Sequence, residues 1–156
     1  MGLKMQSQPA TSDLSGLYDE DFFEWTRRNA ELLRSGQVRQ SDVAHIAEEI
    51  EDLGKQDLKE LHRRARALLA HLSIWQVRSG KRSALLSITT ERVELHGLLK
   101  QSPSLKSRLA NELPDTYAKA LRLAVARTDL QRGQFPAECP FTVEQILDLD
   151  FLPQVQ

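Results

Sequence analysis

A long stretch of helical periodicity between residues 41 and 78 limits the possible folds most strongly. Apolar side chains recur there at steps of three or four residues, the spacing that places them on one face of an α-helix. They are Val43, Ile46, Ile50, Leu53, Leu58, Leu61, Ala65, Leu68, Leu72 and Trp75. One continuous helix of this length would be about 57 Å long, which is long for a chain of 156 residues.

Gly54 leaves two interpretations of this stretch open. A glycine is common just past a helix C-terminus, and Asp57 would then open a second helix. The alternative is one helix that tolerates the glycine, at a cost of about 1 kcal/mol relative to alanine. Because the apolar stripe keeps nearly the same phase on both sides of Gly54, we favour a continuous or gently kinked helix.

The N-terminal part of the chain is predicted to change from disorder to helix near Leu17. Residues 1–16 are polar and aperiodic, which predicts a disordered tail, and residues 17–156 are expected to form a single helical domain. Tyr18 and the aromatic residues that follow it recur at helical spacing until Gly36, which is the expected end of the first helix.

Breaker residues divide the second half of the chain. Ser79-Gly80 is expected to end the long helix, and a helix over residues 83–100 follows. Ser102-Pro103 is expected to start the next helix, because proline is well placed in a first turn. Pro114 must then break or kink that helix, because proline has no N–H to donate inside a helix.

The C-terminus combines a rigid loop with a short helix. The loop is FPAECP at residues 135–140, and Thr142 with Gln145 forms a capping box for the helix. No stretch alternates like a strand, and short connections favour antiparallel neighbours. The sequence therefore predicts an all-α fold: an up-and-down helical bundle with a kinked long helix and a C-terminal clasp of loop plus short helix.

Arg92 occupies an unusual position on the helix predicted over residues 83–100. It lies in the middle of an apolar face formed by Leu85, Ile88, Leu95 and Leu99. A charged side chain is almost never fully buried unless it is paired. We therefore predict an acidic partner for Arg92 from residues 42–49. The alternatives are an anion or phosphate clamp in a cleft and a side chain that extends to solvent.

Glu49 and His71 join Arg92 as the candidate site residues. If the long helix is continuous, Glu49 and His71 lie on one flank of its stripe, six turns apart, so they share a flank but need not meet. A phosphate-bearing substrate would then have Arg92 as anion clamp and Glu49 with His71 as general acid and base.

The sequence gives only weak signals for metal binding, for a reactive cysteine and for nucleic-acid binding. Asp42 and His45 have the spacing of one half of a bundle metal site, but a second Glu-x-x-His pair is missing, so we expect no metal and no cofactor. Cys139 has no histidine nearby in the sequence and is interpreted as a buried loop thiol. A basic ridge comprises Lys55, Lys59, Arg63 and Arg66. Since no aromatic residues interleave with it, a solvated face is the better interpretation.

Composition narrows the partners. The formal net charge is −1, which gives no overall attraction to nucleic acid or anionic lipid. No apolar run approaches the roughly 20 residues that span a bilayer. The single cysteine fits a reducing compartment. We therefore expect a cytoplasmic protein with no membrane association and no nucleic-acid partner; the oligomeric state is not indicated.

The ordered set of motifs resembles a bacterial family of helical proteins, the domain-of-unknown-function family twenty-nine. The residues that carry the resemblance are 18–25 (YDEDFFEW), 42–54, 68–75 (LLAHLSIW), Ser83 with Ile88 and Arg92, 102–105 (SPSL), Tyr117 with Ala120, 135–141 (FPAECPF) and 146–153 (ILDLDFLP). Two positions depart from the family pattern: Ile74 stands where lysine is usual, and Ala84 where tryptophan is usual. The resemblance implies an all-helical fold and no particular activity.

These observations favour a non-enzymatic interaction or regulatory module, whose amphipathic helices would dock a protein partner. Each candidate catalytic residue also has a structural interpretation, so the sequence offers no coherent catalytic set. The alternative is the small enzyme or nuclease described above, acting on a phosphate-bearing substrate through Arg92, Glu49 and His71.

Overall fold

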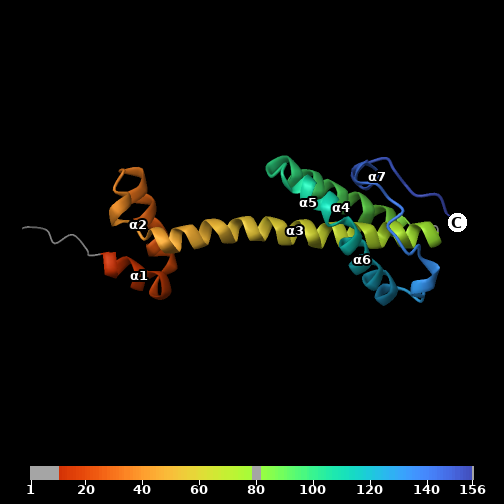
Figure 1. The fold of residues 1–156 in the computed structure, drawn as a ribbon, viewed down its shortest axis with the longest axis horizontal. Helices are drawn as coiled ribbons and strands as arrows, with labels where there is room; N and C mark the ends of the chain where they lie inside the picture. Colours follow the sequence, from red (N-terminus) through yellow and green to blue (C-terminus); the bar gives the residue numbers. More distant parts are fainter. Residues whose placement is uncertain (1–10, 79–81, 156) are drawn as a thin grey trace, which may run out of the picture. The chain divides into compact units, whose positions relative to one another are not determined.

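A computed structural model describes residues 11–78 and 82–155. Within these ranges the chain is helical and contains no strand, which confirms the predicted all-α class (Figure 1). The α-helices are α1 (Thr11–Glu20), α2 (Phe22–Arg34), α3 (Val43–Val77), α4 (Arg82–Gln101), α5 (Leu105–Asn111), α6 (Leu113–Arg127) and α7 (Val143–Leu147). Two short 3-10 helices, η1 (Val38–Gln40) and η2 (Arg132–Gln134), lie in the connections.

The chain divides into two compact units, with the division falling after Gly54. The first unit contains α1, α2, η1 and the start of α3, and the second contains everything that follows. A single domain over residues 17–156 was expected from the sequence. Helix α3 is itself one uninterrupted helix, so the favoured interpretation of Gly54 is confirmed. The break predicted at Ser79-Gly80 lies outside the described residues.

The first unit departs from the sequence prediction in two places. Helix α1 begins at Thr11, so the predicted disordered tail is wrong for residues 11–16, while residues 1–10 lie outside the described part. The helix predicted to run from Leu17 to Gly36 is divided at Asp21, whose Oδ1 accepts a hydrogen bond from the backbone N–H of Glu24 at 2.9 Å. Gly36, with φ of 76°, ends α2 as expected.

A continuous apolar core defines the second unit. It joins the C-terminal half of α3 to α4, α5 and α6; Figure 1 shows α4 along that half of α3 and α6 at an angle to it. Leu61, Leu68 and Leu72 of α3 are completely buried in it. Pro114 lies in the first turn of α6, where its missing N–H removes no helical hydrogen bond, so the predicted break is confirmed.

The segment after α6 packs back on this core through aromatic side chains. Phe135 and Phe141 are 5% and 4% exposed, and Phe141 meets Phe151 edge to face at 6.2 Å. The predicted capping box is present: Thr142 accepts from the N–H of Gln145 at 3.2 Å, and Gln145 accepts from the N–H of Thr142 at 3.0 Å. These bonds fix where α7 begins.

Candidate interaction surface

Arg92 is a buried structural anchor for the last helix. Its side chain is 1% exposed. Its Nε donates to the carbonyl of Ile146 at 2.9 Å, and its Nη2 donates to the carbonyl of Gln145 at 3.3 Å. The prediction of an acidic partner from residues 42–49 is therefore wrong. The last carbonyls of a helix lack intrahelical partners and carry partial negative charge, so α7 supplies acceptors of its own.

Further contacts balance the buried charge of Arg92. Burial lowers the pKa of its guanidinium, and the nearby carboxylates of Asp148 and Asp150 oppose that shift. The guanidinium also lies 6.0 Å from the centre of the Phe151 ring, within the range of a cation–π contact. Arg92 thus ties α4 to α7 and leaves no guanidinium fork directed at a ligand cleft.

The other two candidate residues have separate surroundings. Glu49 lies in the first unit and accepts a hydrogen bond from the Tyr18 hydroxyl at 2.6 Å. This bond is the largest reason that the pKa of Tyr18 rises to about 12. His71 lies in the second unit and lines a cavity with Glu91 and Arg127. Each of the three candidates therefore has its own set of contacts, and Arg92 is not the arginine that accompanies His71.

A polar and aromatic cluster joins the three helices of the first unit. Trp25 Nε1 donates to Asp42 Oδ2 at 3.1 Å, and His45 Nδ1 bonds the same oxygen at 2.7 Å. The His45 ring stacks on Tyr18 with centroids 4.1 Å apart. Asn29 accepts from the N–H of Asp42 at 2.7 Å. The spacing of Asp42 and His45 was considered for metal binding in the sequence, but here the two side chains bond each other.

The electrostatics of this pair are mutual. Burial alone would raise the pKa of Asp42, but hydrogen bonds from His45 and Trp25 outweigh burial and lower it. The bond to Asp42 raises the pKa of His45. The pair therefore stabilises the fold most between these two values: the contribution is lost as pH falls through the lowered pKa of Asp42, and as pH rises through the raised pKa of His45.

We expect Asp42→Asn to lower the pKa of His45, because the substitution removes the carboxylate that stabilises the imidazolium. The measurement is an NMR pH titration of the His45 ring protons. Glu48→Gln is the matched control, since Glu48 acts on His45 only through space and to a lesser extent. An unchanged His45 titration in Asp42→Asn would contradict this account of the pair.

One face of α3 in the first unit is apolar and open to solvent. Val43, Ile50 and Leu53 are 54%, 63% and 63% exposed, and Ile46 between them is partly buried. These four residues, called the α3 stripe below, follow steps of three and four along a regular helix and so share one face. The sequence predicted that these four residues share one apolar face, but it did not predict that three of them are exposed to solvent.

The formal net charge of −1 conceals two opposite halves. Residues 1–54 hold eleven Asp and Glu against five Lys and Arg, a formal charge of −6, whereas residues 55–156 hold eleven against sixteen, a formal charge of +5. On the same helix the side chains of Glu48 and Glu51 are exposed, although Glu48 lies on the side nearly opposite the stripe. The apolar face thus belongs to a unit of net negative charge.

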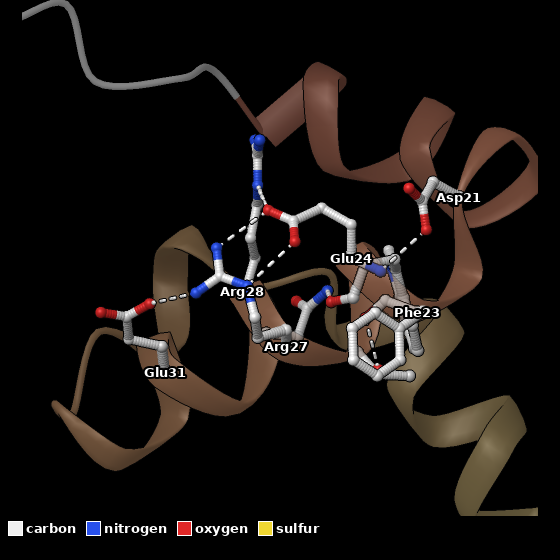
Figure 2. Close-up of polar contacts among 9 residues, drawn as sticks. Asp21, Phe23, Glu24, Arg27, Arg28 and Glu31 are labelled. Atoms are coloured by element: carbon white, nitrogen blue, oxygen red, sulfur yellow. Dashed lines mark hydrogen bonds and ion pairs between the residues drawn. The ribbon is translucent and has the colours of Figure 1, made fainter.

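The arginines of α2 do little to offset this acidity. Figure 2 shows Glu24 between Arg27 and Arg28, with Nε-to-oxygen distances of 2.9 and 2.8 Å. Arg27 also approaches Glu31 at 3.5 Å. The bonds from Arg27 and then Arg28 lower the pKa of Glu24 to about 2. These positive charges are therefore neutralised within α2 itself.

Comparison with known proteins places the chain in a family. The family model described as Domain of unknown function DUF29 matches residues 17–152. The chain belongs to this DUF29 family. The match includes all four residues of the α3 stripe and Arg92 with its partners on α7. No curated protein and no solved structure gives a significant match.

Two further findings concern the described residues of this DUF29 chain. None of the helices there combines the length and apolar character needed to cross a membrane. No three histidine, cysteine or acidic side chains of the described part gather as ligands for a metal ion.

Cys139 is half-buried, and burial raises the pKa of its thiol despite a bond to the carbonyl of Phe141.

Proposed function

We propose that this chain is a non-enzymatic interaction module that binds a basic amphipathic helix of another protein along the α3 stripe. The observation that carries the proposal is the exposure of Val43, Ile50 and Leu53 on one face of a regular helix. A face of this kind costs free energy when left in water, because each Å² of apolar surface contributes about 25 cal/mol when it is covered. The chain has a single cysteine, which fits a reducing compartment and so supports a cytoplasmic setting.

A helix is the form of partner that fits this face. The stripe runs from Val43 to Leu53, which is about 15 Å along a helix axis. Partner helices present anchors at the same i, i+3, i+4 and i+7 spacing, so two such faces match turn by turn. An extended peptide would need free backbone groups at a sheet edge, and the described residues contain no strand.

The charge of the partner follows from the net negative charge of the first unit. Glu48 and Glu51 are exposed on the stripe-bearing helix, and residues 1–54 carry a formal charge of −6. Complementary charge speeds encounter and excludes wrong partners. A second copy of this chain would bring the same acidic surface against itself, which costs free energy. Lysine or arginine residues flanking the apolar face of the partner helix would instead be attracted.

The test is binding of a model peptide of leucine and lysine, about 18 residues long so that it can form a helix, measured by fluorescence anisotropy with the full chain. We expect the double substitution Ile50→Ser with Leu53→Ser to weaken binding roughly tenfold or more, because two apolar anchors are lost. We also expect binding to weaken as salt is added, because the flanking charges are exposed.

Matched controls distinguish binding at the α3 stripe from nonspecific binding to other exposed apolar side chains. Leu33→Ser with Val38→Ser removes two exposed apolar side chains of the first unit that lie outside the stripe, and should leave binding unchanged. A leucine–glutamate peptide should bind poorly. Equal binding by both double variants would overturn the proposal. So would sedimentation showing a dimer that dissociates only in the stripe variant, since a second copy would then be the occupant.

A further inference from the structure

The second unit contains a cavity whose charges remain unexplained by the docking proposal. It has a volume of about 400 Å³ and lies among α3, α4 and α6. Its lining residues are Arg63, Arg66, Ala67, His71, Glu91, Leu123 and Arg127. This volume is within the range of small-molecule sites, which is roughly 300–1,000 Å³. The cavity is therefore large enough for a small ligand.

The acidic residue of the cavity is already occupied. Glu91 accepts a hydrogen bond from Arg64 at 3.2 Å. Arg63 is held by Glu60 in a two-bond pair, at 2.8 and 2.6 Å. These pairs leave two other cationic side chains of the lining to be accounted for.

Arg66 and Arg127 supply the surplus positive charge. Arg66 uses its Nε to donate to the carbonyl of His62 at 3.0 Å. No carboxylate partner is present for Arg66 or Arg127 in the part of the chain that the structure describes. Guanidinium groups present planar sets of donors that match phosphate oxygens two at a time. The arrangement favours a multiply charged oxyanion.

His71 lies at the same cavity and completes it. Burial lowers the pKa of His71, the charge of Arg127 lowers it further, and Glu91 opposes both. A neutral imidazole at neutral pH offers one N–H donor without adding charge. An anion bound beside it would stabilise the imidazolium, so His71 is also a reporter of binding.

A neighbouring cavity of about 250 Å³ shares Arg66 and has a different set of charged side chains. It contains Glu112, bonded to His62 at 2.5 Å, and Asp115, bonded to Lys119 at 2.6 Å. Its two acids therefore bond His62 and Lys119, and Lys59 and Arg66 are its other cationic side chains. The larger cavity differs because Arg66 and Arg127 both offer planar guanidinium groups there, whereas the smaller cavity has Arg66 with Lys59.

We infer that the cavity lined by Arg66, His71 and Arg127 binds a phosphate group, either as free phosphate or as the phosphomonoester of a small molecule. Arg66 and Arg127 bind its oxygens, and His71 donates one hydrogen bond. This site is independent of the α3 stripe, because it lies wholly in the second unit. His71 thus has the phosphate-directed setting considered in the sequence, with different arginines in place of Arg92.

The test is an NMR pH titration of His71 in the full chain with inorganic phosphate, with phenyl phosphate, or with sodium chloride at equal ionic strength. We expect either phosphate probe, but not chloride, to raise the pKa of His71. The tighter of the two phosphate probes identifies the source. Arg66→Gln with Arg127→Gln should weaken the response roughly tenfold or more, because two charge-assisted contacts are lost.

Arg122→Gln is the matched control, because Arg122 is exposed on α6, the helix that also carries Arg127, and does not line the cavity. It should leave the His71 response unchanged. A His71 pKa that moves no more with phosphate than with chloride would overturn the inference. A single-stranded oligonucleotide serves as an additional probe: a His71 response to it, with none to either phosphate probe, would overturn the inference as well, because the basic surface would then bind a nucleic-acid backbone.

Discussion

Arg92→Ala is expected to destabilise the second unit by about 3–5 kcal/mol, as measured by urea unfolding. The substitution leaves the carbonyls of Gln145 and Ile146 without their donor, which costs about 1–3 kcal/mol for each buried group. It also opens a cavity where a side chain that is 1% exposed now lies. The expected result is a lower midpoint with α7 released first.

Two substitutions make this result specific. Arg92→Lys keeps the charge but cannot reproduce bonds from Nε and Nη2 to two successive carbonyls, so it should recover only part of the loss. Val93→Ala, at a neighbouring position that is 54% exposed, should change stability by no more than about 0.5 kcal/mol. A loss below about 1 kcal/mol in Arg92→Ala would show that Arg92 does not anchor α7.

Phe141→Ala is expected to cost about 3–5 kcal/mol, as is usual when a buried aromatic side chain is removed. Phe141 is 4% exposed and contacts Phe151 edge to face. The measurement is thermal unfolding followed by circular dichroism. Leu149→Ala provides the comparison, because Leu149 is 55% exposed in the same segment and its removal should be nearly neutral. Equal effects of the two substitutions would show that the C-terminal segment is loosely attached.

Local signals explain the parts of the fold that the sequence predicted well. The phase of the apolar stripe predicted that α3 continues through Gly54, and the Thr142–Gln145 capping box located the start of α7. Both features depend on residues a few positions apart. The division at Asp21 was missed because the aromatic spacing continues across it, and a single capping aspartate outweighs that pattern.

Contacts between distant residues explain what the sequence could not predict. The partners of Arg92 are backbone carbonyls more than fifty positions away, and a carbonyl has no signature in a sequence. Apolar residues also recur at the same helical spacing in the exposed N-terminal part of α3 and in its buried C-terminal part. Only the structure distinguishes Leu61, which is completely buried, from Ile50, which is 63% exposed.

The most direct test of the docking proposal is a titration of the isotope-labelled full chain with the leucine–lysine peptide, followed by amide NMR. The proposal predicts that the largest shift changes occur along residues 43–53 of α3, and that they disappear in Ile50→Ser with Leu53→Ser. Largest changes at residues of the second unit, or no changes at peptide concentrations that saturate the anisotropy signal, would contradict it.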